Sequence, residues 1–107
     1  MWTYGAKEVT FEGCTFNSAG KSVLVYAEGS SNGSVVTFNG CELNASAPVD
    51  GKAAIEIDSS LIKVEYLVNI NDTQANGFAN GNVSGNSLWN NKKGAKTKVF
   101  VDGAQVL

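Results

Sequence analysis

The sequence contains an internal repeat of roughly 30 residues, and this repeat limits the possible folds more than any other feature. The phrase VTFEGCTFN at residues 9–17 returns 27 residues later as VTFNGCELN at residues 36–44. Weaker copies begin at Val68 and Val99. All four copies share an apolar–x–apolar start, then Glu, Asn or Asp, and then Gly or Asp. The third copy matches least well at Ala75, because the first two copies carry a larger apolar residue at that position.

The segments between these copies also repeat. Residues 20–26 (GKSVLVY) match residues 51–57 (GKAAIEI), and residues 85–90 (GNSLWN) match them more loosely. Each unit therefore holds short β-branched, aromatic or other apolar runs between turns rich in Gly, Asn and Ser, which is the pattern of strands. No window shows a sustained 3.6-residue period with caps, so we expect little or no helix.

Units of this size cannot bury an apolar face alone and must stack on their neighbours. A propeller needs at least four blades of about 40 residues each, which is more than this chain holds. A sandwich of hairpins would not explain why residues 9–17 and 36–44 match position by position. We therefore predict an all-β fold, a short parallel β-helix (a solenoid) of about three to four coils that forms a single domain over residues 1–107.

Stacked coils place equivalent residues one above the next, about 4.8 Å apart. The corner after each copy suits Gly or Asn because φ can be positive there. After the corner the chain should turn inward again, at Val106 in the last copy. Asn17, Asn44 and Asn76 should form a ladder of side-chain amides. The predicted inward rows are Val9, Val36, Val68 and Val99; Phe11, Phe38, Ile70 and Val101; and Cys14 and Cys41.

A stack of this height has two apolar ends. Trp2 and Tyr4 are predicted to cover the first coil, and the strand at residues 98–101 suits a final coil. Uncovered ends would expose apolar surface and strand edges. We therefore expect the chain to be a fragment or C-terminal module of a longer protein, or to form an end-to-end homo-oligomer through its coil ends.

The composition excludes several kinds of function. The chain has no histidine and no arginine, so it lacks Ser-His-Asp machinery, imidazole metal ligands and guanidinium clamps for anions. Its net charge of −2 is unsuited to nucleic acid. No apolar run approaches the ~20 residues of a membrane span. Two cysteines fit neither a disulfide scaffold nor a four-ligand zinc site.

Cys14 and Cys41 occupy the same position of the repeat, so they should be stacked neighbours inside the fold. Two reduced thiols in the core and a disulfide between them are both compatible with that position. A catalytic thiol is not expected, because the sequence offers no base to activate it.

The Val-Thr-Phe-x-Gly-Cys phrases at residues 9–16 and 36–43, with the runs at residues 23–26 and 54–57, resemble the right-handed parallel β-helix repeats of the pectate-lyase-like superfamily. Their short coils, rich in Asn, Gly and Ser, are similar to adhesin-like modules in secreted or surface-anchored proteins of gut bacteria. The resemblance implies an extracellular or cell-surface location. The superfamily includes polysaccharide lyases, polygalacturonases, phage tailspikes, autotransporter passengers and non-catalytic surface modules, so the resemblance implies a fold rather than a function.

The catalytic residues of the enzymes in this superfamily are poorly matched. A polygalacturonase-like hydrolase would need an acidic trio with His, Arg and Lys nearby, and the nearest acidic phrase is Asn71-Asp72. A calcium-dependent lyase with lysine as its base could use Lys52, Glu56 and Asp58, since the two acids alternate on one strand face. The alternative is that this strand face is simply solvated.

Aromatic faces beside amide and carboxylate groups favour sugar binding. In the run at residues 23–26, a one-residue slip of the alignment decides whether the valines or Leu24 and Tyr26 face inward. With the valines inward, Tyr26 would lie outside beside Asp58 and could contact a sugar. The alternative is that the aromatic residues pack in the core or at the ends. A stacking platform would draw on Trp2, Tyr4, Tyr26, Tyr66 and Trp89.

The sequence thus predicts a non-catalytic surface or secreted β-helix module that is adhesive, carbohydrate-binding or purely structural. The alternatives are a fragment of a polysaccharide lyase or hydrolase whose active site lies mostly outside this chain, and a segment of a phage or autotransporter fibre. Glycans are the expected partners, and the candidate ligand-binding residues are Tyr26, Lys52, Glu56 and Asp58. No catalytic residue, metal ligand or cofactor is assigned from the sequence.

Overall fold

The structure is a computed structural model that describes residues 7–19, 23–26, 34–47, 52–58, 65–78, 87–93 and 97–107. These residues form an all-β fold with no helix among them, as the sequence predicted. The predicted cover of the first coil by Trp2 and Tyr4 lies outside the described residues.

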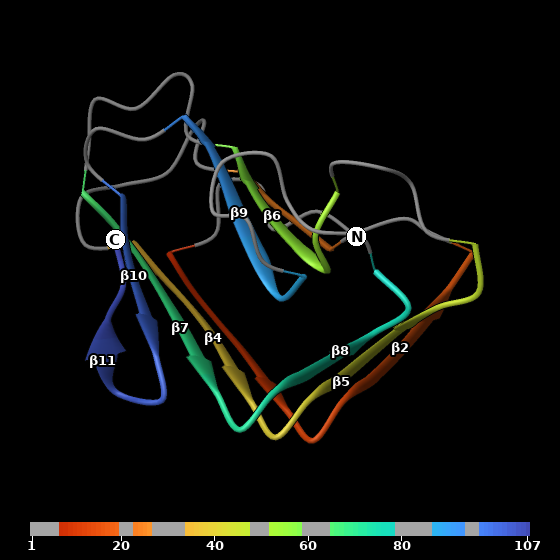
Figure 1. Ribbon diagram of the computed structural model, residues 1–107. Coiled ribbons are helices and arrows are strands. Elements are labelled where there is room, and N and C mark those ends of the chain that lie inside the picture. Colours follow the sequence, from red (N-terminus) through yellow and green to blue (C-terminus); the bar gives the residue numbers. More distant parts are fainter. Residues whose placement is uncertain are drawn as a thin grey trace.

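The described strands form three sheets that the chain visits in turn (Figure 1). The strand orders are β1-β4-β7-β10-β11, β2-β5-β8 and β3-β6-β9, so each circuit adds one strand to each sheet. Each circuit is termed a round below: β1 to β3 form the first, β4 to β6 the second and β7 to β9 the third. The strands are β1 (Glu8–Glu12), β2 (Thr15–Ser18), β3 (Val23–Tyr26), β4 (Ser34–Asn39), β5 (Glu42–Ala45), β6 (Ile55–Asp58), β7 (Tyr66–Asn71), β8 (Gln74–Asn76), β9 (Trp89–Lys93), β10 (Thr97–Val101) and β11 (Ala104–Gln105).

The pairings between successive rounds are all parallel, and in the first two sheets the registers follow the sequence repeat. In the third sheet Val23 pairs with Ile55 rather than with Ala54, so the alignment of residues 20–26 with residues 51–57 is wrong by one residue. Val9 pairs with Val36, Val36 with Val68, and Val68 with Val99, which is the row that the aligned copies place together. The row that begins at Phe11 continues in the same way through Phe38, Ile70 and Val101. Register is fixed because a slip by one residue would turn every apolar side chain to the opposite face.

Strands of all three sheets contribute to one buried apolar cluster. Val23 and Val25 are buried, so the valines of β3 face inward and the one-residue ambiguity of the alignment is resolved. The ring of Phe11 stacks on Phe38, with centroids 5.1 Å apart, and meets Phe16 edge-on at 5.6 Å. The fully buried apolar residues include Val36, Phe38, Leu43, Ile55, Ile57, Val68, Ile70 and Val99.

In each of the three rounds, the corner that joins the first strand to the second has a similar backbone conformation. Gly13, Gly40 and Asp72 have φ values of 59°, 60° and 46°, so the positive φ expected at this position is confirmed. The Gly13 N–H donates to the carbonyl of Asn39 at 2.8 Å, and the Gly40 N–H donates to the carbonyl of Asn71 at 2.9 Å. Each corner amide is thus satisfied by the round that follows it.

The fourth copy of the repeat does not form the predicted corner. Asp102 and Gly103 both have positive φ, 49° and 83°, and they join β10 to β11 in an antiparallel hairpin with Val101 opposite Ala104. Two consecutive positive φ values at Asp-Gly are those of a type I′ turn, which sends the chain back along its own strand. Val106 is consequently 46% exposed rather than turned inward. The outer edge of β10 is occupied by β11.

Candidate functional site

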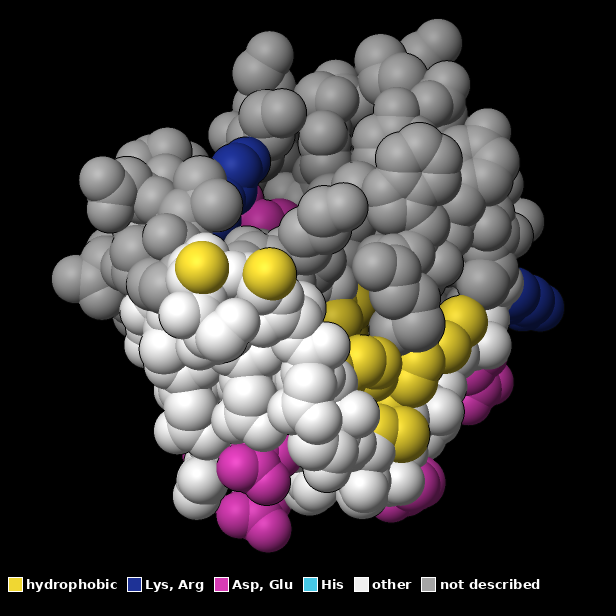
Figure 2. Space-filling view, turned by 90° about the vertical axis from the view of Figure 1, so that its right-hand side faces the viewer, with side chains coloured by type: hydrophobic (Ala, Val, Ile, Leu, Met, Phe, Trp, Pro, Cys, Tyr) yellow, Lys and Arg dark blue, Asp and Glu magenta, His cyan; other side chains and the backbone are white. Residues whose placement is uncertain are grey.

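A row of amide side chains runs across the β2-β5-β8 sheet, on the face opposite the buried residues. The Nδ2 of Asn44 donates to Oδ1 of Asn17 at 3.0 Å, and the Nδ2 of Asn76 donates to Oδ1 of Asn44 at 2.9 Å. The predicted amide ladder is therefore confirmed. Figure 2 views the molecule from the side of these strands and shows mainly backbone and uncharged polar side chains among the described atoms.

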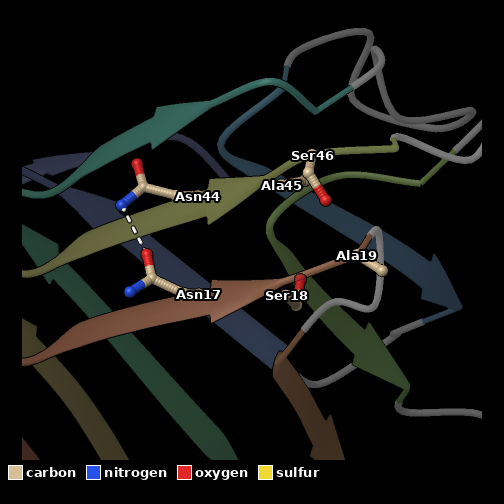
Figure 3. Close-up of a pocket in the computed structure, with 6 residues that line it drawn as sticks. All are labelled: Asn17, Ser18, Ala19, Asn44, Ala45 and Ser46. Carbon is tan, nitrogen blue, oxygen red and sulfur yellow. Dashed lines mark hydrogen bonds between the residues drawn. The ribbon is translucent and has the colours of Figure 1, made fainter.

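An open depression of about 440 Å³ lies where β2 and β5 end (Figure 3). Figure 3 shows the hydrogen-bonded pair Asn17 and Asn44 along one part of it, with Ser18 and Ser46 further along the two strands. The N–H of Ser46 donates to the carbonyl of Ser18 at 3.1 Å, so the strand pairing continues beneath. Amide and hydroxyl groups here can exchange hydrogen bonds with uncharged hydroxyl groups. The lining residues are Asn17, Ser18, Ala19, Asn44, Ala45 and Ser46.

A second row of linked polar side chains, which the sequence did not lead us to expect, lies on the outer face of the first sheet. The Nδ2 of Asn39 donates to Oε1 of Glu12 at 3.0 Å, and the Nδ2 of Asn71 donates to Oδ1 of Asn39 at 3.0 Å. The row is visible in the sequence as the Glu, Asn or Asp before each corner. Its position in the fourth copy is held by Asp102, whose carboxylate accepts the N–H of Asp72 at 2.8 Å.

The four candidate ligand-binding residues are only partly brought together. The register of β3 and β6 places Tyr26 opposite Asp58, so their backbones are adjacent as the sequence required. The side chains of these two residues lie outside the described part. Lys52 and Glu56 form an ion pair with Nζ 3.6 Å from Oε1. The Lys52 side chain is 47% exposed, whereas that of Glu56 is 10% exposed.

The alternative that Glu56 lies on a solvated strand face is wrong. The residue is 8% exposed. Its Oε2 accepts the N–H of Ala53 at 3.1 Å, and its Oε1 accepts Nδ2 of Asn90 at 3.3 Å as well as pairing with Lys52. Alternation along a strand tells which side a residue faces, but not whether that side is covered. A carboxylate with these donors and this little exposure connects β6 to β9 through Asn90 and to the segment before β6 through Ala53.

Two members of the possible aromatic platform are core residues. Tyr66 is 1% exposed and Trp89 is 9% exposed. Their rings are therefore not available to stack on a sugar, in agreement with the alternative that these aromatics pack internally. The side chains of the other members, Trp2, Tyr4 and Tyr26, lie outside the described part.

Cys14 and Cys41 are both free thiols, so of the two open alternatives the structure has the reduced pair. Each Sγ lies near the carbonyl oxygen two residues earlier, at 3.6 Å for Cys14 and 3.5 Å for Cys41. Thr73 takes the same position in the third round, and its Oγ1 donates to the carbonyl two residues earlier at 2.9 Å. The two thiols thus lie at the same position of the corner, and in the third round the hydroxyl of Thr73 donates the hydrogen bond at that position.

Within the described residues, no group of three or more His, Cys, Asp or Glu side chains is placed to hold a metal ion. The same part of the chain has no helix with the length and apolar character needed to cross a membrane.

Comparison of the chain with protein-family models, with curated proteins and with solved structures finds no match. The functional argument therefore depends on the residues of this chain.

Proposed function

We propose that the chain is a short right-handed parallel β-helix, secreted or displayed at a cell surface, that acts as a non-catalytic structural module and ends a stack of coils. Three sheets that each gain one strand per round support the β-helix, because a solenoid stacks its repeats in this way. Right-handedness follows the strong preference of crossovers between parallel strands of one sheet. The location follows only from the resemblance of the repeats.

The observation that carries this proposal is the hairpin that closes one end of the first sheet. The N–H of Val99 donates to the carbonyl of Leu107 at 3.1 Å, and the carbonyl of Val99 accepts the N–H of Val106 at 2.8 Å. A further parallel strand would need these same groups of Val99. The hairpin therefore stops the first sheet at this edge, which is what an end module of a stack requires.

Removal of the hairpin tests this role. A chain truncated after Val101 exposes the backbone groups of Val99 that β11 and the residues after it now occupy. We expect the truncated chain to associate in a concentration-dependent way, because an uncovered strand edge is a template for pairing. The measurement is size-exclusion chromatography with light scattering, with the full chain as reference. A truncated chain that stays as monomeric as the full chain would contradict the proposed end role.

A matched variant separates loss of the cap from loss of the fold. In the truncated chain, Val101→Pro removes an N–H that points to the same edge as that of Val99, and its ring obstructs pairing there. We expect this variant to regain the monomeric state while its circular dichroism spectrum remains that of a β protein. Association that persists in the variant would show that unfolding, and not the free edge, drives it.

Carbohydrate binding is a second candidate function, and the uncharged amide and hydroxyl residues Asn17, Asn44 and Ser46 among those that line the depression favour it. A glycan array is the test, with Asn44→Ala and Tyr26→Ala as variants that separate the depression from the site expected from the sequence. Asn71→Ala, in the other amide row, is the control. Binding that Asn44→Ala alone weakens supports the depression. Absence of binding to all glycans leaves the structural role.

The competing enzyme function has its own assay. Formation of unsaturated products from polygalacturonate, with and without calcium, would show a lyase and would contradict the non-catalytic proposal.

A further inference from the structure

The two ends of the first sheet differ. At the end opposite the hairpin, the inward side chains Val9, Phe11 and Phe16 of the first round are only half-buried. Their counterparts one round later, Val36, Phe38 and Leu43, are 0%, 0% and 1% exposed. Figure 2 shows hydrophobic side chains at the surface on the right of that view, next to lysine and acidic side chains. Among the described residues, the first two strands of the first round thus have the burial expected of strands that are covered on one side only, whereas Val23 and Val25 of its third strand are buried.

The backbone of β1 also has an open edge. The Lys7 carbonyl accepts the N–H of Val35 at 2.9 Å, and the Gly13 N–H donates to Asn39 at 2.8 Å, so the odd-numbered residues direct their backbone groups at β4. The alternation of a parallel ladder then directs those of Glu8, Thr10 and Glu12 to the opposite edge. No described strand pairs with β1 at that edge.

We infer that this open end, formed by the edge of β1 with Val9, Phe11 and Phe16, is a docking surface for one more parallel round of the same repeat pattern. The inference rests on the proposed role as an end module. It extends an interface that the molecule already contains, since the first and second rounds meet through the same backbone ladder and the same apolar rows. The occupant is a strand–corner–strand segment with the apolar–x–apolar pattern of residues 9–17.

Glu12 defines the chemistry of that segment. Its Oε1 accepts the amide of Asn39, so a carboxylate stands at the open end of the row, and the next two members, Asn39 and Asn71, are amides. A segment with Asn at the stacked position donates a hydrogen bond to this carboxylate. A segment with Glu there places two like charges directly opposite, which is destabilising. The open end therefore favours a segment with Asn at the position stacked on Glu12 over a segment with Glu there.

A second copy of this chain is a poor occupant. Stacking of one copy on the other end of a second copy is obstructed in the first sheet by β11. Antiparallel pairing of two β1 edges, with Thr10 opposite Thr10, would set Glu8 of each copy against Glu12 of the other. We therefore expect the full chain to be monomeric in light scattering, and a stable dimer whose β1 edges are protected from hydrogen exchange would overturn the assignment.

The direct test uses two fluorescein-labelled peptides of residues 7–19, both with Cys14→Ser and one with Glu12→Asn, titrated with the full chain in anisotropy measurements. We expect the Glu12→Asn peptide to bind with a Kd at least about tenfold lower than the native-sequence peptide, because a hydrogen bond to a charged group replaces a like-charge contact. In the chain, Glu12→Gln should remove most of this difference, since the amide that it introduces can donate to the glutamate of the native-sequence peptide.

Two variants of the chain locate the binding. Thr10→Pro removes an N–H at the open edge and leaves the groups that pair with β4 in place, so it should abolish peptide binding. Thr10→Ala loses only the side chain and should bind as the native chain does. Circular dichroism of both variants confirms that they remain folded.

Three results would overturn the inference: neither peptide binds at millimolar concentration, both bind equally well, or Thr10→Pro binds as tightly as Thr10→Ala. These outcomes are distinct from failure of the proposed end role, which the hairpin truncation tests at the opposite edge.

Discussion

The side-chain carboxylate of Asp102 accepts the N–H of a corner residue, as the backbone carbonyls of Asn39 and Asn71 do at the two earlier corners. In the first two corners the amide N–H of Gly13 or Gly40 is bound by the carbonyl of the next round. In the third corner the hairpin has redirected the chain, and the carboxylate of Asp102 accepts the N–H of Asp72 instead. Asp102 therefore forms a turn, as the sequence indicates, and its carboxylate also accepts the N–H of the last of the three corners.

Substitution of Asp102 should separate its two contributions. Asp102→Gly keeps the positive φ but loses the acceptor, and we expect a loss of about 1 kcal/mol in the free energy of unfolding. Asp102→Asn keeps an oxygen acceptor and tolerates positive φ, so its stability should change by less than about 0.5 kcal/mol. Urea unfolding followed by circular dichroism measures both. Equal losses in the two variants would show that the hydrogen bond to Asp72 contributes nothing.

The two thiols should differ in reactivity, because Cys41 is 2% exposed and Cys14 is half-buried. In the native protein we expect a thiol reagent such as DTNB to modify Cys14 first, with Cys41 reacting only as the protein opens. In guanidinium both should react, giving two thiols per chain. No reactive thiol in guanidinium without reductant would show instead that the pair is oxidised.

At the scale of elements, the end of β8 approaches β5 closely. Gly77 has a φ of +79°, and a Cβ there would meet the backbone carbonyl of Ala45. Gly40 also has positive φ, +60°, but a Cβ at that corner would meet no other atom within 4 Å. The two glycines therefore share a conformational requirement, and only Gly77 adds a steric one.

Alanine substitutions should show this difference. Gly40→Ala should cost about 1 kcal/mol of unfolding free energy, the usual penalty of a side chain in the left-handed region. Gly77→Ala should cost at least about 1 kcal/mol more, since either β8 or β5 must move to relieve the contact. The comparison is made by thermal or urea unfolding of the two variants under one condition. Equal costs would show that the third round adjusts freely.

At the scale of the whole molecule, stability should depend on the position of a round in the stack. The second round has neighbours on both sides, whereas the first has a described neighbour on one side only. In a fold built from nearest-neighbour contacts, the round with two neighbours opens least often.

Hydrogen exchange with mass spectrometry tests this gradient. Peptides that cover residues 34–45 should exchange more slowly than peptides that cover residues 8–18, and Thr10, whose N–H faces the open edge, should exchange among the fastest in β1. The same rate in both segments would show that the molecule opens as a single unit.

The sequence by itself determined the strands of the aligned copies, their parallel partners in the first two sheets and the amide ladder at Asn17, Asn44 and Asn76. It could do so because register depends on side-chain alternation and on residues that recur at one position of each repeat. Its alignment of residues 20–26 with residues 51–57 is one residue away from the observed register. The amide row at Glu12, Asn39 and Asn71 was equally visible in the repeat and was overlooked.

Only the tertiary structure decided the features that depend on what lies beside a strand. Glu56 is an example, because its position on β6 does not tell that it is only 8% exposed. Its carboxylate accepts hydrogen bonds from the Ala53 N–H and from the side chain of Asn90, which lies 34 residues away in the sequence. Asp102-Gly103 suits either a corner or a hairpin, and the choice depends on whether the following residues pair with Val99 or begin another strand. A local pattern fixes the direction of a side chain and the allowed turns, whereas exposure and the closing of an edge are set by contacts between residues far apart in the chain.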